Sequence, residues 1–386
     1  MENNKRFIPV CEPYLVGKEL EYVTDAVKTG WISSSGKYVK SFEEGFAKYC
    51  GVKHAISTTS GTTAIHLALI ALGIKEGDEV IVPNFTMIGS AFPICYTGAK
   101  PVFVDAEEET WNINPKKIEE KITPKTRAIM VVHIYGHPCD MDPILDIAKK
   151  HNLIVIEDAA EAHGAEYKGK KCGSLGDVAC FSFYANKLVA TGEGGMVVTN
   201  DDKIAEKCRY YKNLCFPLDG SRTYFHEDIG FNYRMSNVIA AIGLGQLENI
   251  EEFIESRRKN NILYRYFLKD VDGIRFQSEK ENCKNVYWMN GVVIDSRRIG
   301  ISRDEIIKRL MEKGVDTRLF FVGMNKQPSL KKYLPQKSEM YPVSDFLSEN
   351  GFYLPSGSGL KVEDIKYICD KIKGVFEEQQ SLRKNT

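Results

Sequence analysis

The sequence predicts an α/β protein with a large domain on a mostly parallel seven-stranded sheet and a smaller C-terminal α+β domain. From residue 55 to about 200, short apolar runs alternate with longer amphipathic segments. This alternation is typical of βαβ units, whose parallel strands are covered by helices on both faces. After about residue 236 the pattern changes to one long helical segment followed by mixed strands and helices. A chain of 386 residues is long enough for two domains.

The large domain is expected to contain seven short strands joined mainly by helices. Each strand is a brief apolar run, and each helix shows the longer spacing of an amphipathic segment. The strands are expected at 55–58, 79–82, 101–104, 128–133, 153–157, 179–183 and 195–199. Helices are expected at 61–73, 86–97, 115–121, 140–151 and 201–211.

The C-terminal domain begins inside a long helical pattern over 236–269, which ends near the turn residues Asp272 and Gly273. We place the boundary at residue 250, which divides the chain into 1–250 and 251–386. The smaller domain is then expected to contain strands at 287–294 and 317–322 and helices at 303–313 and 362–378.

Composition excludes several classes of partner. The chain has 52 Lys and Arg against 52 Asp and Glu, so no net charge attracts a nucleic acid. No stretch approaches the roughly 20 apolar residues of a membrane span, so we expect no membrane partner. Ten cysteines without a CxxC pair indicate reduced thiols. We therefore expect a cytoplasmic protein.

The histidines and one basic run give no sign of a special site. The sequence lacks the Cys/His ligand spacing of a zinc site, so no metal site is expected. Residues Arg257, Arg258 and Lys259 are expected on the solvated face of the long helix. The histidines considered are His54, His66, His133, His137, His151, His163 and His226.

The most informative segment is 179–199, where Lys187 lies between two strand-like runs and precedes the turn TGEGG. A lysine amine is a nucleophile only when deprotonated, and burial lowers its pKa. In such a site Lys187 can form a Schiff base. The alternative is an ordinary solvated loop lysine.

Asp158 ends the apolar strand LIVIED, and ligands of α/β sheets bind at the carboxyl ends of strands. Pyridoxal phosphate requires a lysine and an acidic partner for its pyridine nitrogen, so that its ring acts as an electron sink. Asp158 and Lys187 are placed to supply both. Alternatively, Asp158 caps a following helix.

A third element is the strand end and helix start STTSGTTAIHL at 57–67. Backbone N–H groups and hydroxyls at Ser60, Gly61 and Thr62 suit the phosphate of that cofactor. Ser182 adds a hydroxyl. The alternatives are a plain helix cap for the first group and a satisfied strand serine for Ser182.

Taken together, these motifs resemble the DegT-type sugar aminotransferases, a family of the fold-type I (aspartate-aminotransferase-like) pyridoxal phosphate enzymes. The resemblance covers nearly the whole chain. It rests on TGWISSSGKYVKSFEEGFAKYCG, SGTTAIHLAL, GDEVIVPNFT, VVHIYGHPCDMD, VIEDAAEAHGA, the Lys187 segment with TGEGGMVVT, and FNYRMSNVIAAIGLGQLE.

The resemblance implies a role for each matching residue. Lys187 binds the cofactor covalently and moves a proton, Asp158 pairs with the pyridine nitrogen, and Glu161 lies beside the phenolic oxygen. Asn232 matches an asparagine that reaches the phosphate in the neighbouring subunit, which implies a homodimer with shared sites. The phosphate itself is assigned to Ser60, Gly61, Thr62 and Ser182.

The sequence departs from the family at two positions. Met87 stands where an aromatic ring usually covers the pyridine, and its thioether can still cover an aromatic face. Asn325 stands where relatives commonly have a histidine beside the substrate, so the titratable group is lost. Trp31 either lines the entrance to the site or anchors an interface.

The implied reaction is transfer of an amino group from a donor, expected to be L-glutamate, to a ketone. The segments IPVCEPYLVGKELEYV, VHIYGHPCDM and FNYRMSN look most like those of GDP-perosamine synthases, which aminate C4 of a nucleotide-linked 4-keto-6-deoxy sugar. A competing acceptor is a small phosphorylated ketone such as dihydroxyacetone phosphate, recognised by altered loops at 215–225 and 323–327. A sugar dehydratase and a regulatory sensor are the remaining alternatives.

Overall fold

The computed structural model describes residues 6–221, 223–335 and 339–384. Its centre is a seven-stranded sheet in the order β1-β9-β8-β5-β4-β2-β3. β9 runs antiparallel to both of its neighbours, and the other neighbouring pairs are parallel. The expected mostly parallel sheet is therefore confirmed. Its strands are β1 (His54–Thr58), β2 (Glu79–Pro83), β3 (Lys100–Val104), β4 (Thr126–Val132), β5 (Ile154–Asp158), β8 (Val178–Ser182) and β9 (Gly195–Thr199).

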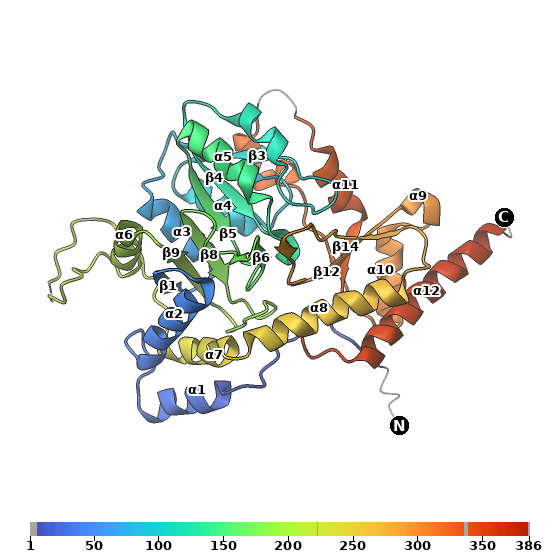
Figure 1. The fold of residues 1–386 in the computed structure, drawn as a ribbon, viewed down its shortest axis with the longest axis horizontal. Helices are drawn as coiled ribbons and strands as arrows, with labels where there is room; N and C mark the ends of the chain where they lie inside the picture. The colour runs from blue at the N-terminus through green and yellow to red at the C-terminus, as the bar shows by residue number, and fades with distance from the viewer. Residues whose placement is uncertain (1–5, 222, 336–338, 385–386) are drawn as a thin grey trace.

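Helices cover both faces of this sheet (Figure 1). Successive strand residues point to opposite faces, so Val178 and Cys180 pack in one apolar cluster and Ala179 and Phe181 in another. The first cluster includes α3 (Gly61–Ala71), α4 (Ile88–Tyr96) and α6 (Asp202–Lys212). The other face is covered by α2 (Lys37–Cys50), α5 (Met141–His151) and α7 (Asn237–Leu247), with α1 (Glu19–Lys28) packed on α7.

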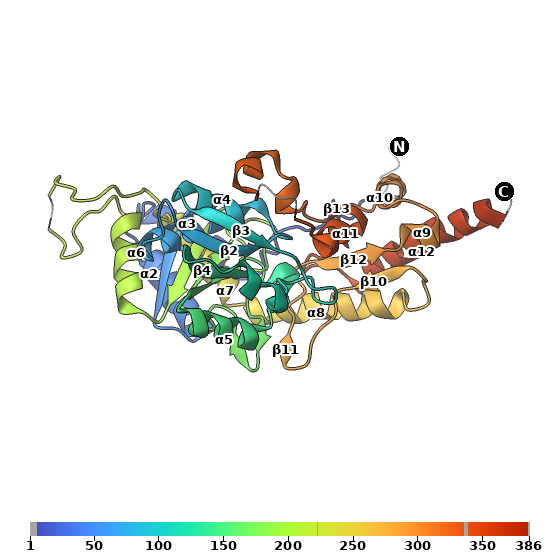
Figure 2. The same cartoon turned by 90° about the horizontal axis from the view of Figure 1, so that it is seen from above.

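The long helical pattern at 236–269 forms two helices instead of one. α7 ends at Leu247 and α8 (Ile250–Phe267) begins after Asn249. The backbone of Asn249 is not helical, and its side-chain amide donates to the Gly245 carbonyl within α7. From this break α8 runs along the second part of the molecule (Figures 1 and 2).

That second part contains a four-stranded antiparallel sheet in the order β10-β12-β14-β13. The strands expected at 287–294 and 317–322 are shorter in the structure. Trp288 and Met289 precede the first strand and Phe320 follows the second, and all three pack in one apolar cluster. The strands are β10 (Ile274–Phe276), β12 (Asn290–Ile294), β13 (Arg318–Leu319) and β14 (Gly351–Leu354). The helices are α9 (Ser296–Ile299), α10 (Arg303–Glu312), α11 (Pro342–Asn350) and α12 (Val362–Lys384).

Shorter elements complete the fold. The helix expected at 115–121 is wrong: the segment forms two 3-10 turns, because Ile118 is its only fully buried side chain and no apolar stripe supports a longer helix. A small antiparallel sheet contains β6 (Glu166–Tyr167), β7 (Lys170–Lys171) and β11 (Cys283–Lys284). The 3-10 turns are Pro115–Lys117, Glu119–Lys121, Ile134–Gly136, Met324–Lys326 and Pro328–Tyr333.

The division at residue 250 falls where α7 gives way to α8, and it stays a prediction. The N-terminal segment also contacts the C-terminal part, since Ile8 pairs with Val315 and packs in the same apolar cluster. Within the described ranges, each helix is too short or too polar to cross a membrane. All ten cysteines are free thiols.

Candidate active site

Three chemically important residues meet at the carboxyl ends of two central strands of the large sheet. Asp158 ends β5 and Ser182 ends its parallel neighbour β8, while Lys187 lies in the connection from β8 to β9. This connection folds back on itself because Ala185 N–H donates to the Gly192 carbonyl at 3.0 Å and Lys187 N–H to the Tyr184 carbonyl at 2.8 Å. The glycine-rich turn therefore returns the chain so that Lys187 stays at the strand ends.

The side chain of Lys187 is largely shielded from water, so the alternative of a solvated loop lysine is wrong. Its side chain is 11% exposed, and its Nζ lies 3.7 Å from Glu161 Oε1. Burial lowers the pKa of Lys187, although the charges of Glu161 and Asp158 act in the opposite direction. An amine with a lowered pKa gives up its proton more readily, so a larger fraction of it is the free, nucleophilic form near neutral pH.

Glu161 is fixed on its other side by the backbone. Its Oε2 accepts a hydrogen bond of 2.7 Å from Tyr135 N–H, and Tyr135 has the left-handed conformation, with φ of 55°. Burial raises the pKa of Glu161 to about 7. The carboxyl group can therefore either hold or release a proton near neutral pH.

Asp158 has a fixed orientation within the same cluster. Its Oδ2 accepts a 2.6 Å hydrogen bond from the Ser90 hydroxyl, and its Oδ1 accepts one of 3.1 Å from Ala160 N–H. Residues 159–165 form turns, so no helix follows for Asp158 to cap and that alternative is wrong. Burial raises the pKa of Asp158, while the Ser90 hydrogen bond opposes this shift. A buried carboxylate of this kind favours a cationic partner.

The start of α3 lies against the end of β8. A Cβ atom on Gly61 would lie 2.7 Å from the Cβ of Ser182, so only glycine permits this approach. Ser60 caps the helix, since its hydroxyl accepts from Thr63 N–H at 3.2 Å, which confirms the helix-cap alternative for Ser60. The N–H groups of Gly61 and Thr62 have no partner inside the helix, and Gly61 lies beside the Ser182 side chain. Such a helix start suits an anion.

Met87 belongs to the same edge of the site. It caps α4, and its Sδ accepts a hydrogen bond of 2.8 Å from Gly89 N–H. A Cβ atom on Gly89 would lie 2.9 Å from that sulfur and 3.3 Å from the hydroxyl of Thr62. Met87 is 49% exposed, so its thioether can cover a ligand that rests on the start of α3.

Two other residues expected in the site do not join this cluster. Asn232 is exposed and pairs with Asn213, and Trp31 is 58% exposed with its carbonyl accepting from Asn237 Nδ2 at 2.6 Å. Within the described part of the chain, no hydrogen bond or ion pair joins either residue to Lys187. Their assignment to the site stays a prediction.

Asn325 is held by a residue that the sequence analysis missed. Asn84, which follows β2, accepts from Asn325 N–H at 2.9 Å and donates to Asn325 Oδ1 at 3.0 Å. It also accepts from Met324 N–H through its carbonyl. Its position directly after an apolar strand was the signal that could have identified Asn84. The loop that carries Asn325 is therefore fixed to the strand ends of the large sheet.

Arg257 and Trp288 were also missed. The expectation of a solvated face is wrong for Arg257, which is 2% exposed, because α8 packs this side of the helix against the chain that leads into β12. Trp288 lies in that chain, and its ring centroid is 3.5 Å from Lys187 Nζ.

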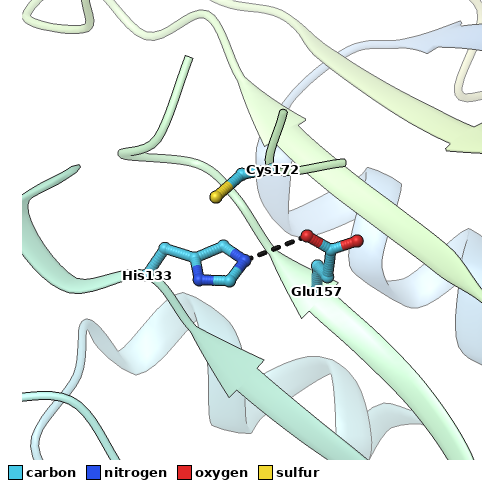
Figure 3. Close-up of side chains that lie close together, drawn as sticks. All are labelled: His133, Glu157 and Cys172. Carbon is cyan, nitrogen blue, oxygen red and sulfur yellow. Dashed lines mark hydrogen bonds and ion pairs between the residues drawn. The ribbon is translucent and has the colours of Figure 1, made fainter. Parts of the chain in front are cut away.

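Figure 3 shows a buried group of His133, Glu157 and Cys172 that has the donor types of a metal site. His133 Nδ1 accepts from Cys139 N–H at 3.0 Å, so its other nitrogen donates to Glu157 Oε2 at 3.0 Å. The two oxygens of Glu157 also accept from the N–H groups of Gly173, Leu175 and Gly176, each at 2.8 Å. These hydrogen bonds explain the group as a support for the turn at 172–176. The absence of a metal site stays a prediction.

The residues at the strand ends fit pyridoxal phosphate. The amine of Lys187 suits its aldehyde, the carboxylate of Asp158 its ring nitrogen, and the helix start with the Ser182 hydroxyl its phosphate. In addition, Asn186 Oδ1 is buried beside Lys187 and has no hydrogen-bond partner among the residues that the structure describes. A buried acceptor of this kind is expected to find a donor when a ligand binds.

Comparison with known proteins agrees with this geometry. The chain matches the DegT/DnrJ/EryC1/StrS aminotransferase family over residues 13–373. It is 43% identical over 374 residues to the GDP-perosamine synthase of Escherichia coli O157:H7, covering 97% of this chain and 100% of that protein. It is 45% identical over 370 residues to the GDP-perosamine synthase of Caulobacter vibrioides, covering 96% and 98%.

Solved structures show the same relationship. The structure of DesI in the presence of its TDP-sugar product has a TM-score of 0.90 and 31% identity, covering 99% of this chain and 96% of that one. Aminotransferases of the matched family depend on pyridoxal phosphate. From its site, its fold and these full-length similarities, the chain belongs to the DegT/DnrJ/EryC1/StrS aminotransferase family.

Proposed function

We propose that this aminotransferase uses pyridoxal phosphate to move an amino group from L-glutamate to C4 of a nucleotide-linked 4-keto-6-deoxy sugar, with GDP as the nucleotide. The observation that carries the proposal is the full-length similarity to two GDP-perosamine synthases in a chain that retains the Lys187 cluster. When bound, the cofactor supplies an electron sink for the reacting carbon.

Each of the three buried acid–base groups has a separate role in the proposed reaction. Lys187 Nζ would hold the cofactor and carry a proton to and from the substrate carbon, for which its lowered pKa suits it. Asp158, oriented by Ser90, keeps the ring nitrogen protonated. Glu161, whose Oε1 lies 3.7 Å from Lys187 Nζ, would hydrogen-bond the phenolic oxygen of the cofactor and balance the charge of the lysine.

The remaining site residues would bind the phosphate of the cofactor and cover its ring. Gly61 and Thr62 offer their N–H groups, and Ser182 its hydroxyl, to the phosphate, while Met87 covers the ring. Because Asn232 is exposed, we propose that it reaches the phosphate in a second copy of the chain, so the active unit is a homodimer. Such an enzyme would work in the cytoplasm.

The acceptor is recognised by the loops at 215–225 and 323–327, as far as the structure describes them. Asn84 and Asn325 form one amide pair at the second loop, and amides can bind sugar hydroxyls as donors and acceptors. The relatives reported above act on sugars by name, so a small phosphorylated ketone is not favoured as acceptor. The presence of Lys187 does not favour a dehydratase or a sensor.

The first test is an absorbance spectrum of the purified protein with added pyridoxal phosphate. We expect a visible band that glutamate bleaches and that GDP-4-keto-6-deoxymannose restores. The dTDP- and UDP-linked 4-keto sugars and dihydroxyacetone phosphate are the comparison acceptors. Restoration by dihydroxyacetone phosphate alone would replace the proposed acceptor, and a band unaffected by glutamate would favour the sensor. Lys187→Ala is the control, because it removes the amine that holds the cofactor.

A further inference from the structure

Trp288 contacts both Lys187 and the residue before it. Its ring centroid lies 3.5 Å from Lys187 Nζ, and its indole N–H donates a 2.8 Å hydrogen bond to the carbonyl of Asn186. One side chain therefore fixes both the amine and the main chain immediately before it. Trp288 is 3% exposed, so these contacts are shielded from water.

A buried arginine holds Trp288 in turn. Arg257 Nη1 donates to the Trp288 carbonyl at 2.8 Å, and its Nε donates to the Ser358 hydroxyl at 3.0 Å. Its Nη2 donates to Cys11 Sγ at 3.4 Å, and that sulfur lies 3.5 Å from the Asn186 carbonyl. The contacts form a closed circuit that returns to the residue before Lys187.

A buried guanidinium is costly unless its donors are used, so Arg257 is a rigid anchor only while this circuit is intact. The circuit joins four segments: the N-terminal segment at Cys11, the β8–β9 connection, α8, and the chain before β12. Its members are far apart in sequence, and they meet at the amine that the proposed reaction uses.

We propose that Trp288 is the positioning residue for Lys187, and that Arg257 acts through Trp288. The indole face sets the direction of the amine, and the indole N–H fixes the turn that carries it. This inference deepens the proposed function and rests on it, because it concerns the lysine that would bind pyridoxal phosphate.

The ring face also acts on the charge of the amine. The face of an indole attracts a cation by an amount that grows when water is excluded. The other groups that face Lys187 are Glu161, Asp158 and Cys11, while burial lowers the pKa of the nearby His163 to about 3 and keeps it neutral. Loss of the ring therefore removes a contact that favours the ammonium and lowers the pKa of Lys187.

The experiment measures covalent capture of pyridoxal phosphate by the cofactor-free protein as a function of pH. Borohydride traps the captured cofactor, and peptide mapping locates it. We expect Trp288→Leu to lower the pH midpoint of capture at Lys187 by roughly one unit. We expect Trp288→Phe, which keeps a ring and loses the N–H, to leave the midpoint in place and slow capture about fivefold.

Two controls separate this role from general stability. Phe376→Leu removes a comparably buried ring in the C-terminal apolar cluster, and it should lower the melting temperature without moving the midpoint. Arg257→Met should slow capture as Trp288→Phe does, because it frees Trp288. If Trp288→Leu does not fold, the Phe and Met variants decide the matter.

The outcomes are distinct. An unchanged midpoint and rate in the Trp288 variants, with native labelling at Lys187, would overturn the positioning role and leave the proposed function intact. Labelling at another lysine in the unaltered protein would overturn the proposed function itself. A Trp288→Leu variant that, like Phe376→Leu, loses melting temperature but keeps the native midpoint and capture rate would reduce Trp288 to a packing residue.

Discussion

At the scale of single residues, the sequence indicated the proposed reacting groups but not the residues that hold them in place. Lys187 and Asp158 could be predicted because each ends or follows an apolar strand, where ligands of α/β sheets bind. Trp288 and Asn84 could not, because each acts through a partner that is remote in sequence. Trp288 and Asn186 are 102 residues apart, and Asn84 and Asn325 are 241 apart.

The charge of Asp158 can be tested without changing its shape. Asp158→Asn keeps an acceptor for the Ser90 hydroxyl but removes the negative charge that we propose holds a proton on the ring nitrogen. We expect the glutamate half-reaction to slow on the order of 10²-fold or more, while the cofactor stays bound. Stopped-flow absorbance measures the rate. An unchanged rate would show that another group carries the role.

The protonation of Glu161 predicts a dependence of stability on pH. Burial raises its pKa to about 7 in the folded protein, from an ordinary value of 4.5. The folded state therefore keeps a proton that the unfolded state has lost between these values, so the free energy of unfolding falls as pH rises from 4.5 to 7. This stabilisation is complete below pH 4.5, and its size is about 3 kcal/mol.

Denaturant unfolding of the cofactor-free protein across that range measures the effect. Glu161→Gln has no titrating group at this position, so its free energy of unfolding should change little between pH 4.5 and 7. The matched comparison is Glu109→Gln, an exposed carboxylate whose pKa is lowered by its hydrogen bond with Lys280. A fall that persists in Glu161→Gln would assign the titration elsewhere.

At the scale of elements, the sheet and the helices between its strands were predictable because each shows one regular apolar period. Two predictions failed, because the apolar spacing did not reveal a break in a helix or the burial of a charged residue. The pattern at 236–269 continues across Asn249, although the backbone there breaks the helix. The run at 257–259 looks polar, although α8 turns Arg257 inward. Hydrophobicity alone does not show that a charged side chain is buried with its partners.

The contact between α3 and β8 gives a prediction at this scale. Gly61→Ala places a methyl group 2.7 Å from the Cβ of Ser182, so the helix start must move away from the strand end. We expect the dissociation constant for pyridoxal phosphate to rise about tenfold or more, with a stability loss of about 1–3 kcal/mol. Fluorescence titration and thermal unfolding measure the two effects.

Gly374→Ala is the matched control for that variant. Gly374 lies in α12 with open space around the added methyl group, so the change should stabilise the helix by up to about 1 kcal/mol and leave cofactor binding unaltered. Equal binding in the Gly61 variant and the unaltered protein would mean that the phosphate does not rest on this helix start.

At the scale of the whole molecule, the single chain presents surfaces that its own fold leaves uncovered. The segment between α6 and α7 extends away from the sheet (Figures 1 and 2). Its side chains Tyr224, Phe225 and Ile229 are each at least 87% exposed, and Asn232 follows them. Exposed apolar groups in one segment are typical of an interface with another chain. These observations support the proposed homodimer with shared sites.

Mixing two inactive variants tests whether the site is shared. If Asn232 serves the site of the neighbouring subunit, each site takes Lys187 from one chain and Asn232 from the other. Lys187→Ala and Asn232→Ala then remove residues that different chains supply to the same site. A hybrid dimer then contains one site with both residues intact and one with neither. Random exchange makes half of the dimers hybrids, so activity should recover to about a quarter of the native value.

The exchange is carried out by mixing the purified variants under conditions that allow dimers to dissociate, and the glutamate half-reaction is followed by absorbance. Lys187→Ala mixed with Lys187→Ala and Asn232→Ala mixed with Asn232→Ala undergo the same treatment and should stay inactive, because no pairing restores a site. If the hybrid mixture gains no activity although chains have exchanged, then Asn232 acts within its own subunit or not at all. Recovery near a quarter would fix the direction of sharing, since only an asparagine supplied across the interface can complete the site of the chain that retains Lys187.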